Sequence, residues 1–310
     1  MRNVKNVYQK VNYWQIDHKI KNIFESKNII VLPSPEAWLK FKWTRKYFGK
    51  KPKEGYFIWV KKEESFPLAT CLNIASPKIS QNLNNLLVIE KGIKAKVNAV
   101  CNVKKNNLCA VHNAQGKLIL KKGSFLEYNH IHQWGKKDLV KMNYQFILKE
   151  NSQLIYNFRD LIPPEKLSLK TTVFEEKNSS SNLSIILNCS DTKVDLSEAL
   201  FLNGENAQGI IRLRLVGRKS SQIKARSSII AKAPAKGHLD CQGLLVDNSA
   251  KICLTPELIC ENKNAQITHE ASIGKISEDE LNYLRMRGLN EKEAIDLIIN
   301  GFLKTEQNYV

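Results

Sequence analysis

Short runs of alternating apolar and polar residues fill the middle of the chain, from about residue 66 to residue 275. This period of two places successive side chains on opposite faces of a β-strand, and repeated strands at this spacing predict a sandwich, a barrel or a coiled β solenoid. Glycine-marked turns such as Lys91-Gly92 and Lys122-Gly123 recur before strands and favour the solenoid, in which each turn buries its inward side chains against its neighbours. The clearest runs are 86–89, 95–100, 117–120, 125–128, 183–187, 210–216, 227–230, 243–246 and 251–254.

The first 65 residues mix helical and extended patterns and predict a small α/β region. Ile16, Ile20, Ile23 and Phe24 share one face at helical spacing, which predicts a helix there. Ser34 followed by Pro35 has the form of an N-cap and a first helical residue.

Residues 276–310 change to a helical pattern. Ser277 and Glu280 form the S-x-x-E signature of a capping box, and Gly288 is placed to end this first helix. A second helix is expected from Asn290 to Gly301, with the apolar stripe Ala294, Leu297 and Ile298. Such a helical hairpin either caps an exposed sheet edge or docks a partner, and the pattern favours neither.

The chain of 310 residues carries a net charge of +18, which raises the alternatives of nucleic-acid or anionic-membrane binding. The lysines are scattered and lie beside turn residues, so a solvated basic surface, drawn from an AT-rich genome, is the favoured interpretation. We find no apolar span of about 18 residues and no secretory signal, and we expect a cytoplasmic protein that does not cross a membrane.

The seven cysteines are widely spaced, with no C-x-x-C pair and no zinc-finger spacing. We therefore expect no disulfides, and most thiols should be small buried apolar groups. The cysteines are Cys71, Cys101, Cys109, Cys189, Cys241, Cys253 and Cys260.

Three short motifs could carry chemistry. In the first, Cys241 should point inward with Leu239, while His238 and Asp240 should share the other face of the strand. In the second, the adjacent residues His269 and Glu270 offer a nitrogen and a carboxylate ligand, but neighbours on a strand face opposite ways. The third is the i, i+2 pair His130 and His132, followed by Trp134; the two histidines either bind a metal or face solvent.

The stretch from about residue 209 to residue 303 resembles the SufB/SufD family, the scaffold proteins of the Suf iron–sulphur cluster assembly system, in its compact SufD-like branch. Several ordered motifs carry the resemblance, namely 237–245, 256–258, 269–276, 281–289 and 294–302. The resemblance implies a right-handed parallel β-helix core, here expected over residues 66–275, and C-terminal helices that bind the family's ATPase partner, SufC.

The resemblance also implies roles for single residues. Cys241 falls where SufB-type proteins carry the cysteine implicated in cluster building, and Glu270 falls on a functional glutamate of SufB. His269 matches the histidine of the same motif in both branches. Trp134 resembles a residue lining the proposed sulphur route in SufB, where His132 replaces a glutamine. His238 is a further accessory candidate, and the residues expected to bind the partner are Leu281, Tyr283, Leu284, Arg287, Gly288, Ile298 and Phe302.

The resemblance thus implies a non-enzymatic scaffold that holds a transient iron–sulphur cluster or iron and binds no nucleotide itself. Expected partners are a SufC-type ATPase, a second copy or a SufB/SufD paralogue, and a cysteine-desulfurase sulphur donor. One alternative is a structural subunit that supports iron uptake without holding a cluster. Two others are a nucleic-acid-binding protein, for which no motif is present, and a carbohydrate-active β-helix enzyme using Asp240 and Glu270.

Overall fold

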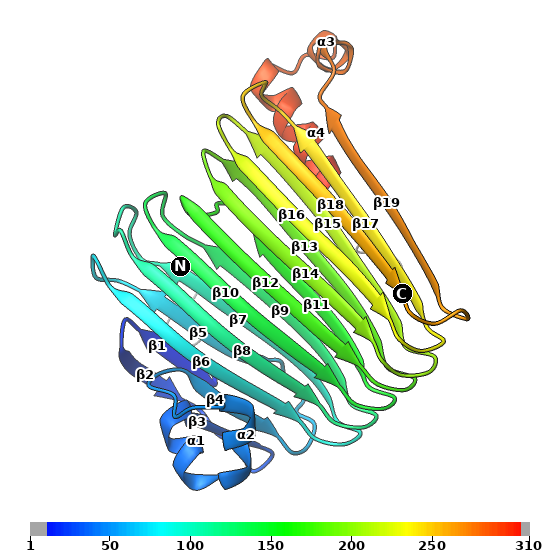
Figure 1. Ribbon diagram of the computed structural model, residues 1–310. Helices are drawn as coiled ribbons and strands as arrows, with labels where there is room; N and C mark the ends of the chain where they lie inside the picture. Colours follow the sequence, from blue (N-terminus) through cyan, green and yellow to red (C-terminus); the bar gives the residue numbers. More distant parts are fainter. Residues whose placement is uncertain (1–10, 305–310) are drawn as a thin grey trace.

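The computed structural model describes residues 11–304 and is a β-solenoid of about eight turns, with 56% of the chain in strands. Two sheets face each other, and Figure 1 shows the chain winding between them from the N-terminal to the C-terminal end. The first sheet has the order β19-β17-β15-β13-β11-β9-β7-β5-β1-β2 and the second β18-β16-β14-β12-β10-β8-β6-β4-β3. The prediction of a mainly β chain with a parallel β-helix core is therefore confirmed.

The strands of the first sheet are β1 Tyr13–Ile16, β2 Lys19–Ile23, β5 Leu68–Ile74, β7 Lys94–Val103, β9 Phe125–Gln133, β11 Gln153–Asp160, β13 Ser180–Ser190, β15 Gln208–Arg218, β17 Lys236–Leu245 and β19 Gln266–Lys275. Those of the second are β3 Ile29–Pro33, β4 Tyr56–Val60, β6 Ser80–Ile89, β8 Val111–Leu120, β10 Leu139–Leu148, β12 Lys166–Glu175, β14 Lys193–Leu202, β16 Gln222–Ala231 and β18 Lys251–Cys260. The helices are α1 Ser34–Lys40, the 3-10 helix η3 Lys42–Thr44, α2 Arg45–Phe48, α3 Glu278–Met286 and α4 Glu291–Lys304.

Each turn of the solenoid supplies one strand to each sheet, and successive turns pair in parallel. Side-chain hydrogen bonds between adjacent turns join residues 27 to 31 positions apart. Burial alternates along β13, where every second side chain enters the space between the sheets. These inward side chains form one continuous core, and a fully buried leucine in it contributes roughly 1.5–3 kcal/mol.

Residues 13–23 form a β-hairpin, so the prediction of a helix there is wrong. Ile16 ends β1, and Asp17 takes a φ of 54°, which turns the chain into β2. The apolar spacing of this segment fits either period, and the turn at Asp17 decides between them. The helix after Pro33 is present, but Ser34 does not cap it; its hydroxyl donates to the carbonyl of Asn84 instead.

Of the two C-terminal helices, α4 lies against the outer face of the first sheet, and α3 packs on α4. Ser277 and Glu280 form the predicted capping box of α3, and Gly288 has a φ of 95° just after its end. Ile299 and Leu303 of α4 pack on outward side chains of β15 and β17. Figure 1 shows the helix α4 beside these strands. Two expectations for this helix were wrong. Leu297, expected in its apolar stripe, is 52% exposed, and Gly301 lies inside α4 instead of ending it.

The helices leave the last two strands uncovered. Alternate residues of β18 and nearly all residues of β19 are exposed, because no further turn stacks on them. No helix in residues 11–304 is long and apolar enough to span a bilayer.

Several of the scattered lysines pair with glutamates of the neighbouring turn along one edge of the solenoid. Surface pairs of this kind contribute only about 0–1 kcal/mol each, so they spread charge more than they stabilise. The pairs are Lys121–Glu90, Lys122–Glu150, Lys149–Glu176 and Lys177–Glu205.

Candidate functional site

Cys241 lies inside the solenoid, one strand below its open end. Its side chain points inward from β17, is 2% exposed, and lies in register with Leu213 of β15 and Ala271 of β19. Burial raises the pKa of this thiol to about 11, against the opposing effect of a hydrogen bond with Ser227. The thiol is therefore protonated near neutral pH and must lose its proton before it can bind a metal.

A buried carboxyl stands behind this thiol. Ser227 of β16 donates a hydrogen bond of 3.2 Å to Oε2 of Glu198 on the neighbouring strand β14. Burial raises the pKa of Glu198 to about 8. Thiol, hydroxyl and carboxyl thus form a polar group inside an otherwise apolar core.

His269 and Glu270 lie on the edge strand β19 and face opposite ways. In the register of β17 with β19, His269 pairs with Leu239 and so shares the inner face with Cys241. Glu270 pairs with Asp240 and shares the outer face. Both are exposed, and within residues 11–304 their ligand atoms do not form a metal-binding group with the sulphur of Cys241.

Asp240 is already engaged. Its two carboxylate oxygens accept hydrogen bonds of 3.0 and 2.6 Å from the guanidinium of Arg214, and both side chains are at most 10% exposed. A carboxylate held in this way is a poor general acid, which removes support from the carbohydrate-active alternative. His238, on the same outer face, is half-buried and shares a hydrogen bond of 2.8 Å with the hydroxyl of Thr268.

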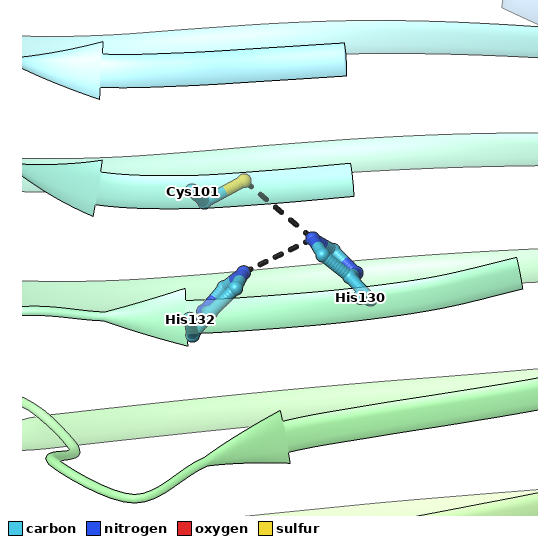
Figure 2. A group of neighbouring side chains, drawn as sticks. All are labelled: Cys101, His130 and His132. Carbon is cyan, nitrogen blue, oxygen red and sulfur yellow. Dashed lines mark hydrogen bonds between the residues drawn. The ribbon is translucent and has the colours of Figure 1, made fainter. Parts of the chain in front are cut away.

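A second group of ligand-type side chains lies in the core nearer the N-terminal end. Nε2 of His130 lies 3.5 Å from the sulphur of Cys101 and 3.1 Å from Nε2 of His132 (Figure 2). Trp134 donates its indole N–H to Nδ1 of His132 at 2.9 Å. The two histidines do share one strand face, as expected, but that face is the core: each is 1% exposed.

Burial also sets the charge of this group. It lowers the pKa of His130 to about 3 and that of His132 well below its ordinary value, and it raises the pKa of the Cys101 thiol. All three side chains are therefore neutral near pH 7. Sequence reasoning missed Cys101, which lies 29 residues before His130; the solenoid period brings the two together.

The residues expected to bind a partner divide into two sets. Tyr283 is 54% exposed and its ring stacks with the guanidinium of Arg287 at 5.3 Å. Leu281, in contrast, is buried, and Ile298 and Phe302 pack against the outer face of the sheet. The exposed apolar side chains of the two helices are Tyr283, Met286 and Leu297.

The amino-acid sequence is similar to one family model and to several curated proteins. The family model described as "SUF system FeS cluster assembly, SufBD core domain" matches residues 72–302. An iron–sulphur cluster assembly SufBD family protein of Methanothermobacter thermautotrophicus is 29% identical over 257 residues, covering 81% of this chain and 63% of the relative. Relatives with the same family description in Archaeoglobus fulgidus and Methanocaldococcus jannaschii are 29% and 28% identical, over 95% and 79% of this chain and 84% and 79% of their own lengths. The chain thus spans less than two thirds of the length of the Methanothermobacter protein.

Proposed function

Because the chain belongs to the SufBD family of iron–sulphur cluster assembly proteins, we propose that it is a scaffold subunit on which clusters are built and from which they are passed on. The cluster is cargo in this proposal, and ATP hydrolysis belongs to a SufC-type partner. A sulphur donor of the cysteine-desulfurase class would supply the sulphide, and the assembly would work in the cytoplasm.

The position of Cys241 carries the proposal. It is an inward thiol on the strand next to the edge strand β19, which pairs with β17 on one side and, within residues 11–304, has no strand on the other. Iron–sulphur clusters need thiolate ligands, with histidine as an occasional substitute. The inward His269 on that edge strand is therefore the candidate for a second ligand on the same face as Cys241.

A second chain completes the site in this proposal. Edge strands such as β18 and β19, each paired along one side only among the described residues, offer free backbone groups that pair readily with another strand. We assign this edge to a second copy or a SufB/SufD paralogue, which would enclose Cys241 and His269 at the interface. Glu270 faces outward, so it joins them only if β19 twists when the partner docks.

Mixed ligation suits a scaffold. A site with one thiolate, one imidazole and one carboxylate should hold a cluster less tightly than four thiolates do, and a scaffold must release its cargo. Because the Cys241 thiol must lose a proton on binding, loading should improve as the pH rises.

The exposed apolar residues of α3 and α4 are assigned to the ATPase. Tyr283, Met286 and Leu297 lie on two helices anchored to the sheet by Ile299 and Leu303. A nucleotide-dependent movement of these helices would reach β15 and β17, and so the turn that holds Cys241.

The test is anaerobic reconstitution with iron and sulphide, followed by absorption spectroscopy. Wild type should develop a sulphide-to-iron charge-transfer band, Cys241→Ser should lose it, and Cys189→Ser should keep it. Cys189 is the matched control because it is also a buried inward cysteine of the same sheet. A band of equal strength in Cys241→Ser contradicts the assignment.

One observation favours a second candidate function, a structural subunit that holds no cluster. The Cys241 thiol is buried and its pKa is raised, which disfavours the thiolate in the isolated chain. In that case no variant, nor the wild type, takes up a cluster, even with the partner chains bound.

A further inference from the structure

The three donor atoms of Cys101, His130 and His132 converge inside the core. The sulphur comes from β7 and the two Nε2 atoms from β9, and all lie within 4.8 Å of one another. Figure 2 shows the sulphur and the two ring nitrogens turned toward a common point. Both strands end there, so the group lies close to the turns that follow them.

The spacing of these atoms is close to that of ligands around a tetrahedral ion. With metal–nitrogen bonds of about 2.0–2.1 Å and metal–sulphur bonds of about 2.3 Å, tetrahedral donors lie roughly 3.3–3.6 Å apart. From His130 Nε2 the sulphur lies 3.5 Å away, inside this range, and the nitrogen of His132 lies 3.1 Å away, slightly closer than an ion between them would require. We propose that Cys101, His130 and His132 form a binding site for a divalent transition-metal ion of the Zn²⁺ and Fe²⁺ class, with its fourth position open.

The donor set agrees with this class of ion. One thiolate and two imidazoles are typical ligands of zinc and iron, whereas calcium and magnesium take oxygen ligands. A site with three protein ligands keeps a position for a small ligand, as in many zinc sites that exchange a bound molecule.

The hydrogen bond that Trp134 donates determines which ring nitrogen of His132 carries the proton before an ion binds. The indole N–H is a donor only, so Nδ1 of His132 must present its lone pair. Neutral His132 therefore carries its proton on Nε2, where it points at Nε2 of His130. An ion takes the place of that proton: the Cys101 thiol releases its own proton to solvent, and the His132 proton moves from Nε2 to Nδ1, which breaks the hydrogen bond from Trp134.

The surroundings of His130 predict a site that binds its ion weakly enough to exchange it with solvent. A ligating imidazole usually donates its other N–H to a carboxylate or carbonyl, which strengthens the site. Nδ1 of His130 is buried and, among the described residues, has no hydrogen-bond partner. The ion is therefore held without that support and suits transient storage more than a structural role.

This site is separate from the proposed cluster site and goes beyond it. Cys101 on β7 and Cys241 on β17 are five strands apart in the same sheet, about 24 Å at the usual strand spacing. With sulphide supplied chemically, Cys101→Ser should still take up a cluster at Cys241. Cluster uptake and metal binding can therefore be tested separately, and either proposal can fail while the other stands.

The test is an anaerobic Co²⁺ titration of the full chain with the exposed thiols Cys109, Cys253 and Cys260 replaced by Ser. A thiolate-to-cobalt charge-transfer band should saturate at one ion per chain and disappear on addition of Zn²⁺. Cys101→Ser and His130→Gln should each weaken Co²⁺ binding by more than about tenfold, and Cys189→Ser should leave it unchanged.

Circular dichroism checks that each variant is folded. Two results overturn the proposal: no band in the parent chain, or a band of equal strength and affinity in both ligand variants. The absence of a band in the parent chain overturns the proposal even if a variant fails to fold. It would mean that Cys101, His130 and His132 only form hydrogen bonds between neutral side chains.

Discussion

Arg214 and Asp240 form a bidentate ion pair between adjacent strands, with hydrogen bonds of 3.0 and 2.6 Å and little exposure of either side chain. Removing one partner of a buried pair leaves the other charge without compensation. We expect Asp240→Asn to lower the free energy of unfolding by about 3–5 kcal/mol. Urea unfolding measures the change, and Arg226→Met, on an exposed outward arginine, is the control with little effect.

The buried carboxyl of Glu198 should make stability depend on pH. Its pKa is about 8 when folded and near 4.5 when unfolded, so the folded chain binds more protons between these values and stability falls as the pH rises through that window. The buried histidines, with lowered pKa values, act below about pH 6.5 and in the opposite direction.

Glu198→Gln should therefore become more stable than wild type as the pH rises from about 6.5 to 9, and the difference should shrink toward pH 5. Urea unfolding at several pH values measures it. Glu257→Gln, on an exposed carboxyl of the second sheet, should follow wild type throughout. A difference that does not change with pH would show that the carboxyl does not titrate in this range.

Trp134 and His132 link the indole to the proposed metal site. Trp134→Phe removes the donor that holds the lone pair of His132 Nδ1, so the ring can carry its proton there and bind an ion without losing a hydrogen bond. We expect Co²⁺ to bind about fivefold more tightly in this variant, as measured by the charge-transfer band. Weaker binding would mean that the indole supports the site instead of competing with it.

The open edge should control association. Ile273 lies on the inward face of β19 and is 44% exposed, because no further turn covers it. A lysine there would bring a charge into any interface formed on this edge. We expect Ile273→Lys to fold normally and to weaken association with a second copy or a paralogue by more than about tenfold, as measured by analytical ultracentrifugation. Ser272→Lys, on the outward face, is the matched control.

The exposed helical surface should control binding of the ATPase. Leu297 is 52% exposed on α4, so a glutamate there costs little folding free energy but disrupts an apolar contact. We expect Leu297→Glu to weaken binding of a SufC-type ATPase by about tenfold or more, as measured by calorimetry. Lys292→Glu, at the exposed start of α4, should change it much less.

Much of the fold could be predicted from the sequence, because inward and outward residues alternate along nearly every strand. The error at residues 13–23 arose because Ile16, Ile20 and Ile23 fit both a helix and a pair of short strands. The capping box at Ser277 was found because capping depends on neighbours in the sequence. Leu297 was misplaced because the sheet against which α4 packs selects a different stripe.

The chemistry of the core was harder to predict. Cys101 lies beside His130 only because two turns stack in register, and the turns repeat too loosely in sequence to reveal that register. The alternation rule did place Cys241 inward and separated His269 from Glu270. In the proposed site those residues act together only once a partner chain docks, and one chain's sequence does not contain that contact.

Transfer of a cluster tests the scaffold role most directly. The reconstituted chain, with a SufC-type ATPase and ATP, is mixed anaerobically with an apo acceptor protein, and the cluster content of the acceptor is measured after separation. The account predicts that wild type and Cys189→Ser load the acceptor and that Cys241→Ser does not. An acceptor that stays empty with wild type, or loads equally with Cys241→Ser, would contradict it.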